Sequence, residues 1–89
     1  MCIRDRSWPL RAQAAKALGK LAIKRSVPAL ERVLDDPAWW VRANAAGALR
    51  ELGEPGHAAL ERALEHEDRY ARDRAREALA LDRLIVPAA

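Results

Sequence analysis

Two stretches of the chain decide its fold: Leu10–Leu21 reads LRAQAAKALGKL, and Val41–Leu52, thirty-one residues later, reads VRANAAGALREL. Seven of these twelve positions are identical, and Ala71–Leu79 (ARDRAREAL) continues the pattern thirty residues further on. A second motif recurs between them, as ALERVL at Ala29–Leu34 and ALERAL at Ala59–Leu64. A period of about thirty residues built from two segments indicates a repeat protein.

Each segment has the periodicity of an α-helix. The apolar residues of the first stretch follow the i, i+4, i+7, i+8, i+11 pattern, at Leu10, Ala14, Ala17, Leu18 and Leu21. The same stripe recurs in the second and third copies. Because the loops between segments are short, successive helices must be antiparallel neighbours. The sequence therefore predicts an all-α fold, an α-solenoid of about two and a half antiparallel helical hairpins in the order A1-B1-A2-B2-A3.

Composition supports this class and limits the alternatives. The 89 residues are 51% hydrophobic but only 4% aromatic, and a third of them are charged. No apolar run approaches the ~20 residues of a membrane span, so we expect no membrane contact from these residues. The net charge is +3 with both signs interspersed, which permits nucleic-acid contacts without arguing for them. Cys2 is the only cysteine, so no disulfide can form within the chain.

Polar residues mark the predicted helix starts. Ser7 and Ser26 are candidate N-caps of the A1 and B1 helices, and Asp68 is a candidate N-cap of A3. Asp36 followed by Pro37 is a strong start for A2, with the carboxylate as the N-cap and proline at the first helical position.

The repeat unit resembles the HEAT repeat family, and within it the short bacterial type called PBS-lyase HEAT-like repeats. The resemblance depends on AAxALxxL in the A helices, VPAL at Val27–Leu30 and LDDPAWWVRANAAGAL at Leu34–Leu49. It implies that A helices form a convex layer and B helices a concave layer. The loop after A1 departs from the family pattern, because Ala22, Ile23 and Lys24 stand where Gly-Asp-Pro is usual. We expect repeats at 7–36 and 37–67 and a partial repeat at 68–89.

The first six residues read MCIRDR. They resemble the translated adapter of shotgun sequencing libraries, which begins many reading frames taken from metagenomes. We expect residues 1–6 to be a non-native tail; the alternative is a genuine basic N-terminus. The chain would then be a bacterial fragment flanked by further repeats of a longer parent. Its localisation is unknown, and cytoplasmic by default, because any targeting segment would have been lost.

The A helices carry the first group of candidate interaction residues. Arg11, Arg42 and Arg72 occupy one equivalent position and are expected to form a row, either paired with acidic residues of the preceding turn, such as Asp35 or Asp36 with Arg42, or binding a ligand directly. Trp39 is the better candidate for an exposed anchor, whereas Trp40 is expected to pack between repeats. The alternative is that both tryptophans seal the edge of the hairpins. Asn44 has poor helix propensity and is expected to hydrogen-bond the neighbouring hairpin or to contact a ligand.

The B helices supply a second group, with mixed charge on the predicted concave face: Glu31, Arg32, Glu61 and Arg62. The sequence offers no nucleophile elbow, phosphate loop or paired carboxylates for catalysis. His57 and His66 lie nine residues apart, which is not a spacing of helical metal ligands. We therefore expect no enzyme activity, no metal and no cofactor.

Three functions remain open at this point. The first is a non-catalytic scaffold or adaptor that binds a protein or peptide. The second is nucleic-acid binding through a basic face, which the balanced charge of the B helices makes unlikely. The third is an accessory subunit of a bilin lyase, which the family resemblance alone implies.

Overall fold

The computed structural model describes residues 8–85, and it describes the side chains of residues 8–81. Five α-helices and one 3-10 turn make up this part of the chain, which contains no strand: α1 (Trp8–Lys20), η1 (Lys24–Ser26), α2 (Val27–Arg32), α3 (Trp39–Glu51), α4 (Glu54–Ala63) and α5 (Arg69–Ile85). The predicted all-α class is confirmed. No helix in the described residues is both long enough and apolar enough to cross a membrane.

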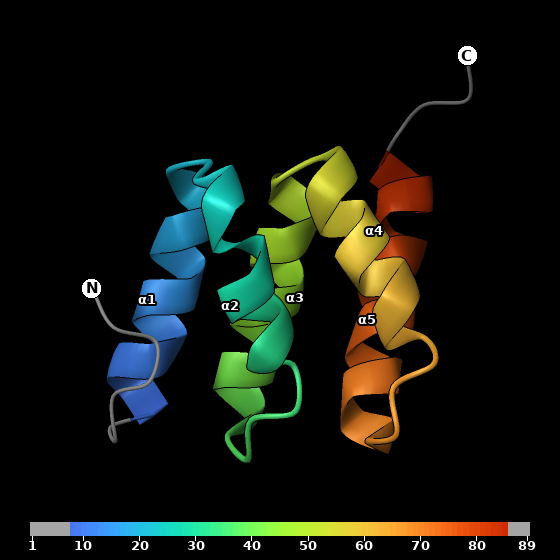
Figure 1. The fold of residues 1–89 in the computed structure, drawn as a ribbon, viewed down its shortest axis with the longest axis horizontal. Coiled ribbons are helices and arrows are strands. Elements are labelled where there is room, and N and C mark those ends of the chain that lie inside the picture. Colours follow the sequence, from blue (N-terminus) through green and yellow to red (C-terminus); the bar gives the residue numbers. More distant parts are fainter. Residues whose placement is uncertain (1–7, 86–89) are drawn as a thin grey trace.

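The helices form two layers (Figure 1). The A helices α1, α3 and α5 lie side by side in one layer, and the B helices α2 and α4 lie in front of them. Helix α3 packs against all four other helices, whereas α1 packs chiefly against α3. This arrangement is an α-solenoid, with two hairpins and a further A helix within residues 8–85.

Small residues bring the A helices close together. The core consists of the leucines of α2, α3 and α4 with a continuous set of alanines from all three A helices. Gly19 of α1 faces Ala48 of α3 so closely that a Cβ on Gly19 would lie 2.6 Å from the Ala48 Cα. Short side chains permit this approach between neighbouring helices, which is why alanine dominates the repeat.

The predicted apolar stripe is buried in α3 but only partly in α1. Val41 and Leu52 are 0% and 1% exposed, whereas the equivalent residues Leu10 and Leu21 are 56% and 66% exposed. The first copy therefore buries only part of its stripe. The reason is that α3 has neighbours on both sides, while α1 is the outermost helix of the described stack.

The helix starts differ from the predicted caps at two places. Ser26 makes no capping bond, because its hydroxyl donates to the Ile23 carbonyl instead. The α3 helix begins at Trp39, two residues later than expected, and Asp36 accepts a hydrogen bond from the Ala38 backbone N–H at 2.8 Å. Asp68 does cap α5, since its Oδ1 accepts the N–H groups of Tyr70 and Ala71. The predicted cap at Ser7 lies outside the described residues.

The loop after α1 closes as a Schellman motif. The N–H of Ile23 donates to the Leu18 carbonyl and that of Ala22 to the Gly19 carbonyl, both at 3.1 Å. Ala22 therefore occupies the left-handed position, with φ at 55°. Glycine is the usual residue there because a Cβ strains this conformation.

Candidate interaction surface

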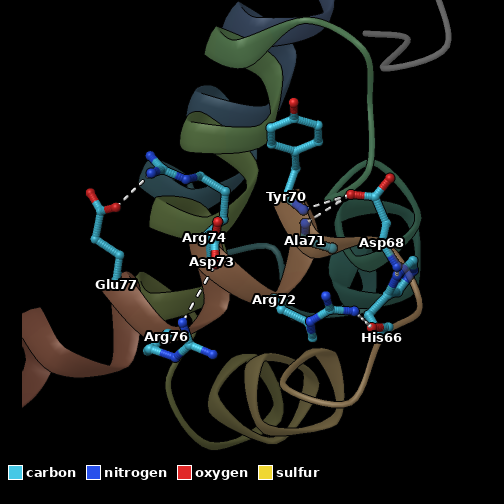
Figure 2. A network of polar contacts seen from close by, with 9 residues as sticks. All are labelled: His66, Asp68, Tyr70, Ala71, Arg72, Asp73, Arg74, Arg76 and Glu77. Carbon is cyan, nitrogen blue, oxygen red and sulfur yellow. Dashed lines mark hydrogen bonds and ion pairs between the residues drawn. The ribbon is translucent and has the colours of Figure 1, made fainter.

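Two residues of the predicted arginine row, Arg42 and Arg72, bind backbone carbonyls of the loop just ahead of their own helix. Arg42 donates from Nη1 to the carbonyls of Asp36 and Pro37, at 2.7 and 3.1 Å. Arg72 makes the same pair of bonds, to the His66 carbonyl at 2.7 Å (Figure 2) and to the Glu67 carbonyl at 2.8 Å. Each guanidinium thus holds the loop that leads into its own helix.

Arg11 acts differently, because it joins α1 to the loop ahead of α3 through a carboxylate. It forms a two-pronged ion pair with Asp36, with Nε–Oδ2 at 2.9 Å and Nη2–Oδ1 at 3.1 Å. Both side chains are largely buried. With the Asp36 carboxylate engaged by Arg11 and Ala38, only its carbonyl serves Arg42, so the expected carboxylate pairing of Arg42 is wrong. Arg42 is only 8% exposed, and a role in direct ligand contact does not fit it.

The surroundings of the Arg42 side chain differ from those of Arg11, its equivalent in the preceding A helix. His66 stands where Asp36 stands one repeat earlier, and its Nδ1 accepts the Asp68 N–H at 2.9 Å. The Arg42 guanidinium lies 4.6 Å from the centre of the Tyr70 ring, a cation–π contact. Its Nε is buried without a hydrogen-bond partner. The equivalent nitrogen of Arg11 has the Asp36 carboxylate.

Two of the four charged residues predicted on the concave face pair with each other. Glu31 of α2 pairs with Arg62 of α4, with N–O distances of 2.9 and 3.0 Å. The hydrogen bond and the negative charge of Glu31 raise the pKa of Arg62 above its ordinary value. Arg32 and Glu61 remain exposed. The B-helix layer therefore offers less unpaired charge than the sequence suggested.

Every described aromatic side chain is exposed, and each lies at the start of an A helix: Trp8, Trp39, Trp40 and Tyr70. The exposure of Trp39 agrees with its prediction as an anchor. Trp40 is 53% exposed, so the expectation that it packs between repeats is wrong. The two tryptophan rings contact edge to face, with centroids 4.5 Å apart.

A groove of about 340 Å³ separates α1 from α3 at this aromatic edge. We call it the α1–α3 groove, and its lining residues are Trp8, Pro9, Ala12, Gln13, Lys16, Trp40 and Asn44. Asn44 donates from Nδ2 to the Ala12 carbonyl at 2.9 Å, as predicted for a contact with the neighbouring hairpin. That bond holds the short Asn44 side chain down at the base of the groove.

The next pair of A helices, α3 and α5, has a smaller pocket of about 100 Å³ that lies further along the helices and is not lined by any aromatic residue. At the aromatic edge of this pair, Arg74 takes the place of Asn44, and its guanidinium lies 5.7 Å from the centre of the Trp39 ring. Glu77 contacts the Arg74 guanidinium at 2.6 Å (Figure 2). A long side chain therefore lies beside the tryptophan in this pair of helices, where the α1–α3 groove has the short Asn44.

The sequence did not identify Trp8 and Trp40 as two walls of one groove. Their register was visible, since Trp8 aligns with Trp39 and the A helices repeat every thirty residues. The sequence did not show that the space between the two rings is open, because this depends on the direction of the Asn44 side chain. Within the described residues, no three or more His, Cys, Asp or Glu side chains converge as metal ligands would.

Comparison with known proteins agrees with this architecture. Residues 1–80 match a family model described as HEAT repeats. Phycocyanobilin lyase subunit alpha of a Picosynechococcus species is 46% identical over 50 residues, which are 56% of this chain and 19% of that protein. The subunit of the same name from a Nostoc species is 47% identical over 45 residues, 51% of this chain and 16% of that protein.

The chain thus spans less than a fifth of the length of these curated relatives. The relatives agree with the resemblance to PBS-lyase HEAT-like repeats, and the family match covers most of the chain. The repeated hairpins, the alanine-rich core and these matches lead to one conclusion: the chain belongs to the HEAT repeat family.

Proposed function

We propose that this chain is a non-catalytic interaction module that binds a protein partner through the aromatic edge of its A helices. The observation that carries the proposal is the exposure of all four described aromatic side chains along that edge. Tryptophan and tyrosine are enriched in binding hot spots because they bury large areas at low entropic cost. Burying them against a partner would remove this apolar surface from water.

The aromatic edge is favoured over the other candidate surfaces by the contacts that the charged residues make. Arg11 and Arg42 are largely buried, and they hold loops and repeats together. On the B-helix layer, Glu31 and Arg62 satisfy each other. Arg42 and Arg74 contact the rings of Tyr70 and Trp39, but all four aromatic side chains remain exposed and are available to a partner.

Capture of partners by variants of the 89-residue chain tests this function. The double substitution Trp8→Ala/Trp40→Ala should abolish recovery of a protein that the wild-type chain binds. The matched double substitution Arg32→Ala/Glu61→Ala, on the B-helix layer, should leave recovery unchanged. Recovery that is lost only in the second variant would contradict the proposal, and so would recovery of no protein.

A second candidate function has a specific observation in its favour. Two relatives with 46–47% identity over the matched residues are named phycocyanobilin lyase subunit alpha, so an accessory role toward a bilin is a proposal for this chain as well. Adding phycocyanobilin to the chain should then change the visible absorption of the pigment. An unchanged spectrum would remove this candidate.

The nucleic-acid alternative has less support. Six arginines of the described part have intramolecular partners: Arg11, Arg42, Arg62, Arg72, Arg74 and Arg76. Phosphate contacts would have to displace those partners. A titration with duplex DNA at low salt, where such binding is strongest, decides the matter.

A further inference from the structure

We propose that the α1–α3 groove binds a proline-rich segment of the partner in the polyproline II conformation, with an acidic residue next to the prolines. This inference rests on the proposed function and names the chemistry of the partner. Four features carry it: the two aromatic walls of the groove, the polarity of its lining, its length, and the Arg74–Trp39 contact at the equivalent position of the next helix pair.

The walls suit proline rings. Trp8 and Trp40 are 46% and 53% exposed and line the groove together with Pro9. Grooves bounded by aromatic rings bind polyproline segments because each proline presents a flat apolar ring. The polyproline II conformation is preformed, so little conformational entropy is lost on binding.

The polar groups of the groove are chiefly donors. The indole N–H groups of the two tryptophans, the Gln13 amide and the Lys16 ammonium can all donate, and no carboxylate lines the groove. Proline has no backbone N–H, so a polyproline segment offers carbonyl acceptors and needs no acceptor in return. The positive charge of Lys16 selects an acidic residue beside the prolines.

The length of the groove sets the length of the ligand. Trp8 and Lys16 both line the groove and are eight residues apart in α1, which corresponds to about 12 Å at about 1.5 Å per residue. A polyproline II segment rises about 3.1 Å per residue. The groove therefore accommodates about four residues.

The contact between Arg74 and Trp39 indicates how the α1–α3 groove can be closed. The Arg74 guanidinium of α5 lies beside the Trp39 ring of α3. Asn44 holds the equivalent position in the α1–α3 groove and is too short to reach across it. The substitution Asn44→Arg should place a guanidinium beside Trp8 and fill the groove from within.

Titration of the 89-residue chain with a synthetic peptide tests the proposal. The probe contains four consecutive prolines followed by two glutamates, and its control has alanines in place of the prolines. We expect saturable binding of the proline peptide, followed by tryptophan fluorescence and calorimetry, and at least tenfold weaker binding of the alanine peptide. No saturable binding of the proline peptide, or equal binding of both, overturns the proposal.

Variants assign the binding to the groove. Trp8→Ala, Trp40→Ala and Asn44→Arg should each weaken binding at least tenfold, and Arg32→Ala, at an exposed position on the B-helix layer, should change it less than twofold. Circular dichroism establishes that each variant is folded. Equal weakening by Arg32→Ala would contradict the assignment. If the peptide fails while partner capture still requires Trp8 and Trp40, the proposed function stands and the proline-rich ligand is excluded.

Discussion

At the scale of single residues, Asp36 connects the A helices of the first two repeats. Its carboxylate accepts two bonds from Arg11 and one from the Ala38 backbone, and its carbonyl accepts one from Arg42. The sequence placed the arginines in one row but could not assign their partners. Those partners are chiefly backbone carbonyls, whose directions are set by the loop conformation rather than by residue type.

Replacing Asp36 by alanine should be strongly destabilising. The change leaves the largely buried Arg11 guanidinium without its carboxylate, and breaking such a pair costs about 3 kcal/mol. Asp35→Ala removes a neighbouring carboxylate that is half exposed and should cost less than about 1 kcal/mol. Urea unfolding measures both changes, and similar values for the two variants would contradict the role given to Asp36.

His66→Asp should stabilise the second junction. An aspartate at this position would offer Arg42 Nε the carboxylate that Asp36 offers Arg11, and satisfying a buried donor contributes about 1 kcal/mol. His66→Asn is the control, because it keeps an acceptor for the Asp68 N–H without the charge. Unfolding midpoints should rank the aspartate variant above the asparagine variant, and the reverse order would refute the argument.

At the scale of helices, the repeat pattern predicted the segments well and their ends less well. Asp68 caps α5 as expected, but Asp36 and Pro37 stand ahead of α3 rather than within it. The Asp-Pro pair is a common helix start. Here the Asp36 carboxylate binds Arg11 of another helix, and α3 begins only at Trp39. Such competition between a local cap and a distant partner is invisible in one sequence.

The end of α1 contains a strained residue that can be relieved. Ala22 has a positive φ in the Schellman motif, and an L-residue pays about 1 kcal/mol in this conformation. Ala22→Gly should raise the free energy of unfolding by about that amount. Ala58→Gly, at an exposed position inside α4, should lower it by about 0.5–1 kcal/mol. Thermal unfolding of both variants measures the two changes. Stability that changes in the same direction in both variants would contradict the prediction.

The close approach of α1 and α3 depends on Gly19. A methyl group there would lie 2.8 Å from the Ala48 Cβ, so Gly19→Ala should separate the helices and cost about 1–3 kcal/mol. Gly47→Ala is the matched control, because no atom lies within 4 Å of its added Cβ, and better helix propensity should stabilise it by up to about 1 kcal/mol. Denaturant midpoints that move together would contradict the packing described.

At the scale of the whole molecule, the repeat register fixed which residues share an edge, but not which of them line an open groove. Trp8, Trp40 and Asn44 come from two helices whose spacing is set by Gly19 and the alanines of the core. A repeat pattern gives the order of the helices, whereas the volume between them depends on side-chain directions. This is why the aromatic edge was only partly predictable.

A proton–nitrogen spectrum of the 89-residue chain, recorded during titration with the proline peptide, locates the binding site directly. We expect progressive shifts of the Trp8 and Trp40 indole signals and of the Gln13 side-chain amide, with α5 signals unchanged. Shifts centred on Arg32 and Glu61 of the B-helix layer, or none at saturating peptide, would contradict this expectation.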